Sequence, residues 1–125
     1  MAKILLVEDD ALSRDLAQRW LIRQGYEVVT ARDGDQAVAA AQAQAPDLIL
    51  MDLSLPRVDG WTAAREIKGT PTTRHIPIIV LTAHVAPAVR EDALRAGCDE
   101  YEAKPIDFPS LKTKIETLLK KGKPQ

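Results

Sequence analysis

The sequence has one cysteine, almost no net charge and no long apolar run. Because Cys98 is alone, an internal disulfide and a cysteine-built metal site are both excluded, and we expect a small buried residue in a reducing compartment. The 17 basic and 18 acidic residues leave a net charge of −1, which gives no electrostatic reason to expect a nucleic-acid or membrane partner. The apolar runs, about five residues each, are too short for a membrane span or a secretory signal. We therefore expect a cytoplasmic protein.

The chain is long enough for one domain with a real core, and its hydrophobic content of 46% is that of soluble globular proteins. Short runs rich in valine, isoleucine and leucine predict strands, and a weaker run near the C-terminus predicts a fifth strand at a sheet edge. Segments with helical spacing alternate with these runs. The predicted strands are residues 4–7, 28–30, 48–51, 78–81 and 101–103, and the predicted helices are residues 11–24, 36–44, 61–68, 87–96 and 108–121.

The first predicted helix has an apolar stripe. Leu12, Leu16 and Trp20 are spaced four residues apart, whereas Arg14 and Arg23 fall elsewhere on the helix. This spacing predicts that the leucine and tryptophan stripe is buried and that the arginines are solvated.

The first, third and fourth predicted strands are apolar without alternation, which is typical of strands covered by helices on both faces. The strict alternation of strands and helices predicts an α/β fold with a parallel sheet. Right-handed crossovers bring the end of every strand to one edge of such a sheet, where ligands bind. Functional residues are therefore expected just after the strands.

Polar residues follow the strands at these positions: Glu8, Asp9 and Asp10 after the first, Asp52 after the third, Thr82 after the fourth and Lys104 after the fifth. Carboxylates that converge at one edge repel one another and need a compensating cation. Mg²⁺ fits best because it prefers oxygen ligands and the set contains no histidine or cysteine. A lysine and a hydroxyl beside such a metal can stabilise a phosphoryl group in transfer, and the Asp52 carboxylate is the best candidate for its nucleophile.

Each of these residues also has an ordinary structural explanation. Asp10 can cap the first helix, Thr82 can cap the fourth, and Lys104 can be a solvated surface charge. Asp59-Gly60 is first of all a turn signal. The placement of one such site at each strand end favours the functional interpretation over these separate explanations.

Four motifs, in this order and spacing, resemble the receiver family of two-component response regulators over essentially the whole chain. They are Val7-Glu8-Asp9-Asp10, Leu50-Met51-Asp52-Leu53 with Leu55-Pro56 and Asp59-Gly60, Leu81-Thr82-Ala83, and Ala103-Lys104-Pro105. The resemblance implies a flavodoxin-like, doubly wound (βα)5 fold with strand order 2-1-3-4-5 and helices on both faces. It assigns residues 1–121 to the receiver domain and leaves residues 122–125 as a short polar tail.

The resemblance also implies roles for individual residues. Asp52 would be the phosphoacceptor, and Asp9, Asp52 and the Ser54 backbone carbonyl would coordinate Mg²⁺, with Glu8 acting through a water. Mn²⁺ could substitute for Mg²⁺. Lys104 would pair with the phosphoryl oxygens, and the Lys104-Pro105 peptide bond would be cis.

Further implied roles concern the switch and the lifetime of the acyl phosphate. Thr82 and Tyr101 would change position on phosphorylation, although Tyr101 can equally be an aromatic residue that covers the edge strand. Ser54 and His84 stand two residues after Asp52 and Thr82, where the family tunes the dephosphorylation rate.

The function implied is that of a single-domain response regulator in a two-component phosphorelay. A histidine kinase or phosphotransfer protein would phosphorylate it, docking near the first helix, and the chain would catalyse only its own phosphorylation and dephosphorylation. Because the chain ends just after the fifth helix, we expect it to signal to an unidentified downstream protein by contact, as a monomer or as a phosphorylation-dependent dimer.

Three alternatives are less consistent with the sequence. A phosphatase of the haloacid-dehalogenase type needs a second acid two residues after its nucleophile, where this chain has Ser54. A flavin phosphate would be repelled by the acids after the first strand. A degenerate receiver that binds partners without phosphorylation would not need the full set of Asp9, Asp52, Thr82 and Lys104.

Overall fold

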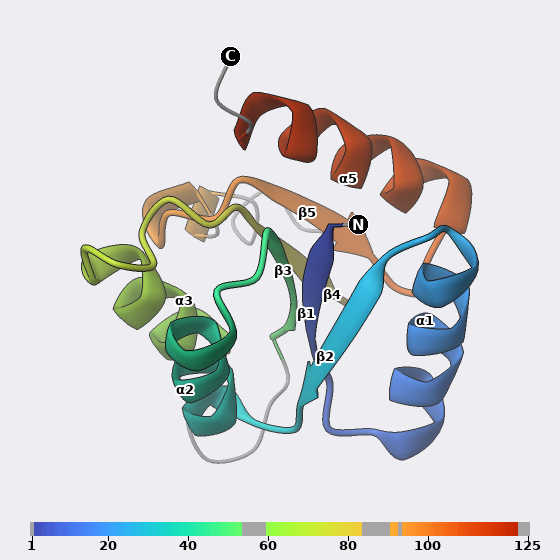
Figure 1. Cartoon of the computed structure of the whole chain (residues 1–125), viewed down its shortest axis with the longest axis horizontal. Helices are drawn as coiled ribbons and strands as arrows, with labels where there is room; N and C mark the ends of the chain where they lie inside the picture. The colour runs from blue at the N-terminus through green and yellow to red at the C-terminus, as the bar shows by residue number, and fades with distance from the viewer. Residues whose placement is uncertain (1, 54–59, 84–90, 93, 123–125) are drawn as a thin grey trace.

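The computed structural model describes residues 2–53, 60–83, 91–92 and 94–122 (Figure 1). Its elements in chain order are β1 (Lys3–Val7), α1 (Ala11–Arg23), β2 (Glu27–Ala31), α2 (Gly34–Gln44), β3 (Leu48–Asp52), α3 (Gly60–Gly69), β4 (Ile78–Thr82), β5 (Glu100–Ala103) and α5 (Phe108–Gly122). Every predicted strand is present. The fourth predicted helix begins outside the described residues, but Glu91, Asp92, Leu94 and Arg95 within it are helical.

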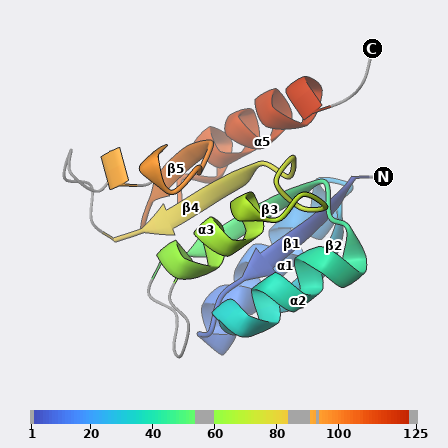
Figure 2. The same cartoon turned by 90° about the vertical axis from the view of Figure 1, so that its left-hand side faces the viewer.

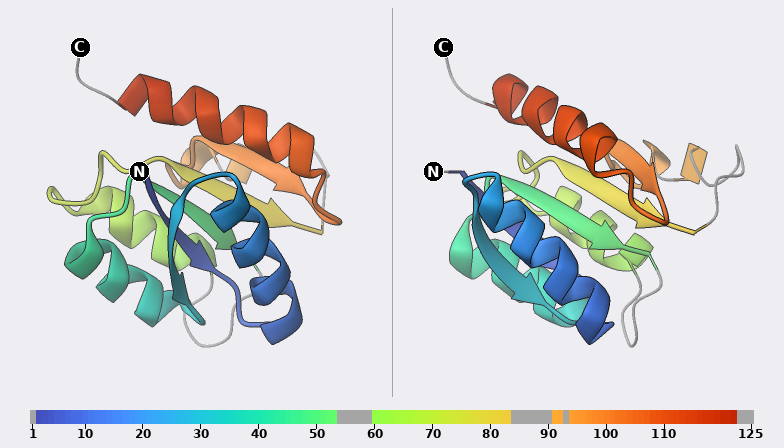
Figure 3. Two further views of the ribbon diagram at one scale, coloured as in Figure 1. Left: turned by 45° about the vertical axis from the view of Figure 1, so that its right-hand side comes forward. Right: turned by 90° about the vertical axis from the view of Figure 1, so that its right-hand side faces the viewer.

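The five strands form one parallel sheet in the order β2-β1-β3-β4-β5, as predicted. Figure 2 shows α2 and α3 in front of the sheet, and the right-hand panel of Figure 3 shows α1 and α5 in front of its other face. Since all strands run in the same direction, their carboxyl ends lie at one edge. The fold is flavodoxin-like, with helices on both faces.

Two apolar cores pack against the two faces of the sheet. Successive residues of a strand point to opposite faces, so each central strand contributes to both cores. In β3, Ile49 and Met51 pack with α2 and α3, whereas Leu48 and Leu50 pack with α1 and α5. All five residues of β3 are buried. This explains why the strand reads as a continuous apolar run.

The predicted burial of the α1 stripe is wrong. Leu12 is 68% exposed and Leu16 is 57% exposed, whereas Ala17 and Leu21 are the buried residues of the helix. Ala17 and Leu21, and not the leucines of the stripe, are the α1 residues that pack in the core against the sheet. Trp20, at the end of the stripe, is partly buried and meets the Phe108 ring at a centroid distance of 4.8 Å.

Gly60 lets α3 begin directly beneath the end of β3. A Cβ atom at this position would lie 2.7 Å from the Asp52 carbonyl oxygen and 2.9 Å from the Leu53 Cα. Both neighbours are backbone atoms, which cannot move without displacing the end of the strand. The chain therefore needs a glycine here to keep Asp52 in place.

Among the described residues, no helix is both long and apolar enough to cross a lipid bilayer.

Candidate functional site

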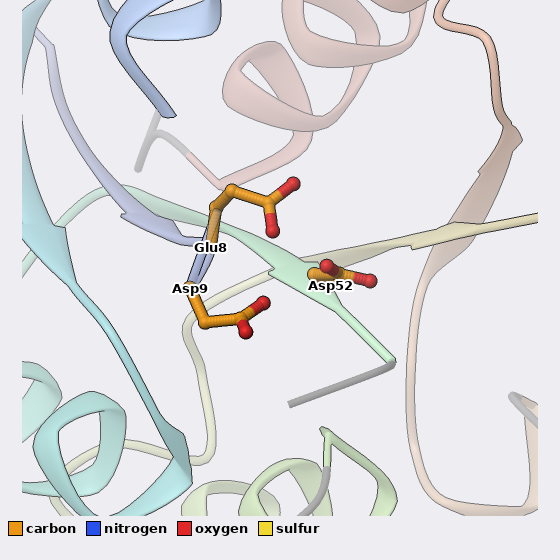
Figure 4. A group of neighbouring side chains, drawn as sticks. All are labelled: Glu8, Asp9 and Asp52. Carbon is orange, nitrogen blue, oxygen red and sulfur yellow. The ribbon is translucent and has the colours of Figure 1, made fainter. Parts of the chain in front are cut away.

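Three carboxylates meet at the carboxyl edge of the sheet. Glu8 and Asp9 follow β1, and Asp52 is the last residue of β3 (Figure 4). One oxygen atom from each of the three lies within 4.8 Å of the other two. Glu8 and Asp52 are buried, at 4% and 3% exposure, whereas Asp9 is exposed. The predicted convergence of acids from two separate strands is present in the structure.

Lys104 completes this cluster from the end of β5. Its Nζ lies 3.0 Å from Asp52 Oδ2 and 3.2 Å from Glu8 Oε1. When all four groups are ionised, three negative charges face one positive charge, so two negative charges are unbalanced. The cluster is therefore able to accept a divalent cation.

The proton affinities of the cluster reflect this imbalance. Burial, together with the hydrogen bond and charge of Asp52, raises the pKa of Glu8 from 4.5 to about 7, against the opposing effect of Lys104. Burial disfavours the charged form of Lys104, but its hydrogen bonds and ion pairs with Asp52 and Glu8 outweigh this and raise its pKa. Lys104 thus stays protonated at neutral pH. The negative charge of Asp52 repels the ionised form of the Glu8 carboxylate.

Thr82 and Tyr101 lie on the neighbouring strands. Thr82 is the buried last residue of β4, and its carbonyl oxygen accepts a hydrogen bond of 2.8 Å from the Lys104 N–H. Tyr101 pairs with Val80, two positions before the strand ends, and is partly buried against the core formed with α2 and α3. Lys114 Nζ lies 5.3 Å from its ring centroid. Thr82 is thus at the functional edge, and Tyr101 is farther back in the sheet.

The remaining sequence predictions fall into two groups. Asp10 caps α1, because its Oδ2 accepts the Ser13 N–H at 2.8 Å, and the Lys104–Pro105 peptide bond is cis. Cys98 is buried, which raises the pKa of its thiol to about 11. Ser54, His84 and Asp59, by contrast, lie outside the described residues.

Sequence reasoning missed two features beside the cluster. It assigned Arg14 to the solvated face of α1, although the guanidinium donates to the backbone of Glu8 and Asp9. It also missed a groove of about 290 Å³ between α1 and the segment after β5. The available signal for Arg14 was its position. It lies one turn into the helix and six residues after Glu8, close enough to contact the acidic segment.

The donor atoms fit a hard divalent ion. The three side chains of the cluster offer only carboxylate oxygens, which Mg²⁺ and Mn²⁺ prefer, and none of the nitrogen or sulfur ligands that favour zinc or copper. Each of the three carboxylates can offer a ligand atom to such an ion, although Glu8 and Asp52 also pair with Lys104.

Glu8→Gln is expected to stabilise the metal-free protein at alkaline pH. Because the pKa of Glu8 is raised on folding, the native chain should lose unfolding free energy as the pH rises from about 4.5 to about 7, and the loss should persist above that range. The variant lacks this titration, so its advantage at pH 8 should be on the order of 2 kcal/mol. Urea unfolding at pH 5 and pH 8 with EDTA measures it.

Glu27→Gln is the matched control, since Glu27 is an exposed acid of β2 that pairs with Lys3 at 3.5 Å. It shows the effect of removing one exposed carboxylate, with which the effect of Glu8→Gln is compared. An equal pH dependence for Glu8→Gln would contradict the raised pKa.

Comparison with known proteins agrees with the fold and with the cluster. The family model of the response regulator receiver domain matches residues 4–116. Response regulator PleD of Caulobacter vibrioides (strain NA1000 / CB15N) is 39% identical over 119 residues, which cover 95% of this chain and 26% of PleD. The polar-differentiation response regulator DivK of Brucella anthropi is 35% identical over 116 residues, which cover 93% of this chain and 94% of DivK. The chain therefore spans nearly all of DivK but only 26% to 55% of several other curated relatives.

A solved structure also agrees with the fold and with the acidic cluster. The receiver domain of the sensor histidine kinase PA1611 from Pseudomonas aeruginosa PAO1 has a magnesium ion coordinated in its active-site cleft. It is 40% identical to this chain, with a TM-score of 0.88 over 94% of this chain and 97% of that domain. With the family match over most of the sequence, these similarities show that the chain belongs to the response regulator receiver domain family of two-component systems.

Proposed function

We propose that this chain accepts a phosphoryl group on Asp52 from a histidine kinase or phosphotransfer protein and signals by phosphorylation-dependent contact with another protein. The observation that carries the proposal is the position of Asp52. It lies at the end of a central strand, within 4.8 Å of two further carboxylates and 3.0 Å from the Lys104 ammonium. In this proposal the chain assists only its own phosphorylation and dephosphorylation. Its cytoplasmic location stays a prediction.

The roles of the cluster residues follow from their charges. An Asp52 oxygen attacks the phosphorus, the oxygen–phosphorus bond forms, and the bond from phosphorus to the donor's histidine nitrogen breaks, with the electron pair leaving on that nitrogen. Asp9, Asp52, the Ser54 carbonyl and Glu8 through a water would hold Mg²⁺, which would supply positive charge to the phosphoryl oxygens. Lys104 pairs with another of these oxygens.

The output is a change in the surface beyond the phosphorylation site. Thr82 lies one strand away from Asp52 and can donate its hydroxyl to a phosphoryl oxygen there, which would draw the end of β4 inward. Tyr101, on the neighbouring strand, then changes position with it. Ser54 and His84 tune the lifetime of the acyl phosphate. A change of this kind shifts a population between two states by a few kcal/mol.

Intact mass spectrometry with a small acyl-phosphate donor tests the proposal. With Mg²⁺ the chain should gain the mass of one phosphoryl group, and with EDTA it should gain none. Continuous hydrolysis of phosphate esters without a stable mass gain would favour a phosphatase. No gain in either condition would favour a receiver that binds partners without phosphorylation.

The upstream partner is proposed to dock in the groove beside α1. The groove is mainly apolar and is lined by Leu16 and Ala17 of α1 on one side and by Pro105, Ile106 and Phe108 on the other. Glu8 and Lys104 also line it, so it opens onto the phosphorylation site. A helix with an apolar face could pack against exposed Leu12 and Leu16 and bring its phosphohistidine to Asp52.

Leu16→Asp is expected to slow phosphotransfer from such a partner roughly tenfold, because it places a charge in the apolar contact. Phosphorylation by the small donor should keep its native rate. Ile22→Asp is the control, since Ile22 is equally exposed, at 55%, on another side of α1. Rates are measured with a phosphotransfer protein that phosphorylates the native chain. Equal slowing by both variants, or none by Leu16→Asp, would place docking elsewhere.

A further inference from the structure

The Arg14 side chain binds two backbone carbonyls of the acidic segment that follows β1. Its Nη1 donates to the Glu8 carbonyl oxygen at 3.0 Å and to the Asp9 carbonyl oxygen at 3.3 Å. Its own backbone N–H donates to the Asp10 carbonyl oxygen at 2.9 Å. The last of these is the ordinary backbone bond of the helix, so the arginine side chain itself holds the peptide units of two consecutive acids, Glu8 and Asp9.

The three acids do not depend on Arg14 equally. Glu8 is buried, its N–H donates to the Ala31 carbonyl oxygen at 3.0 Å, and its carboxylate pairs with Lys104. Asp10 is tied to α1 by its own capping bond to Ser13. Asp9 lies after the end of the strand with an exposed side chain, and the bond from Arg14 ties its carbonyl to the helix. The orientation of Asp9 should therefore be the most sensitive to Arg14.

This arrangement separates the backbone oxygens of the segment from its carboxylates. The carbonyl oxygens of Glu8 and Asp9 are occupied by the guanidinium on the α1 side, whereas the two carboxylates extend toward Asp52 (Figure 4). Both hydrogen bonds come from Nη1, which carries two N–H groups and lies one covalent bond farther from the backbone than the ammonium of a lysine would. Groups that orient metal ligands typically change metal affinity 10- to 100-fold when they are lost.

We propose that Arg14 is a positioning residue that sets the affinity of the acidic cluster for Mg²⁺ by fixing the backbone of Asp9. The inference rests on the proposed function only in taking Mg²⁺ as the ion that the cluster binds. Arg14 acts through the Glu8 and Asp9 carbonyls and leaves the carboxylates free to face the ion.

Titration calorimetry with MgCl2 on the unphosphorylated chain tests this role, with Arg14→Met, Arg14→Lys and Arg19→Met as variants. Arg14→Met should weaken Mg²⁺ binding about tenfold. Arg14→Lys keeps the charge, but its ammonium ends one covalent bond short of the Nη1 position, so it should recover only part of the affinity. Arg19→Met loses the same charge one turn farther along α1, where Arg19 pairs with Asp15 at 3.0 Å, and its affinity should stay within about twofold of native.

Thermal unfolding in EDTA separates positioning from a structural role, because a structural role would lower the unfolding temperature without changing the affinity of the folded chain. Native affinity in Arg14→Met, full recovery in Arg14→Lys, or equal weakening in Arg19→Met would each overturn the inference. If Arg14→Met does not fold, Arg14→Lys alone decides the question. A native chain that binds no Mg²⁺ at millimolar concentration would overturn the proposed function as well.

Discussion

Asp52→Asn is expected to abolish phosphoryl uptake, both from a small acyl-phosphate donor and from a phosphotransfer protein. The amide of asparagine has nearly the size of the carboxylate, so it fills the same buried space at the end of β3. It has no anionic oxygen to attack phosphorus and is a poorer ligand for a divalent ion. Intact mass spectrometry should therefore detect no phosphoryl gain in the variant under conditions that saturate the native chain.

Asp47→Asn is the matched control for this experiment. Asp47 directly precedes β3 at the opposite edge of the sheet, where its exposed carboxylate accepts the Lys3 N–H at 2.7 Å. The same change at the other end of the same strand should leave uptake at the native level. Phosphoryl gain in Asp52→Asn would show that another residue is the nucleophile and would contradict the proposed role of Asp52.

The sequence predicted the sheet and its functional edge because both depend on simple periodicities. Continuous apolar runs identify strands buried on both faces, and a parallel sheet must bring their carboxyl ends together. Asp52 and Thr82 proved to be the last residues of β3 and β4, and Lys104 directly follows β5. The convergence of the acids with Lys104 therefore followed from topology and needed no knowledge of side-chain packing.

Side-chain packing limited the remaining predictions. The spacing of Leu12 and Leu16 identified an apolar stripe, but it could not say whether the stripe faces the sheet or its rim. That depends on how α1 packs against the sheet, which is a property of two elements together. Likewise, the bonds from Arg14 depend on the angle at which the chain leaves β1, which spacing alone does not specify. The bonds of Arg14 and the groove lined by Leu16 are both contacts between segments, and both lie beside the acidic cluster.

Lys104→Gln is expected to change phosphoryl uptake and cation binding in opposite directions. The ammonium lies 3.0 Å from Asp52 and 3.2 Å from Glu8, where it repels an incoming divalent cation. Its loss should therefore leave Mg²⁺ affinity unchanged or increase it. In the proposed transfer the same charge would stabilise a phosphoryl oxygen, so its loss should slow uptake from a small donor on the order of 100-fold.

Calorimetry and intact mass spectrometry on the same preparation measure the two effects of Lys104→Gln. Lys114→Gln is the control, because Lys114 also pairs with a buried acid, Glu102, at 2.9 Å, but on the α5 side of β5 and away from the cluster. Its uptake and affinity should both match the native chain. If Lys104→Gln weakened cation binding and uptake together, Lys104 would serve mainly to hold the carboxylates in place. A native uptake rate would instead show that phosphoryl transfer does not depend on the charge of Lys104.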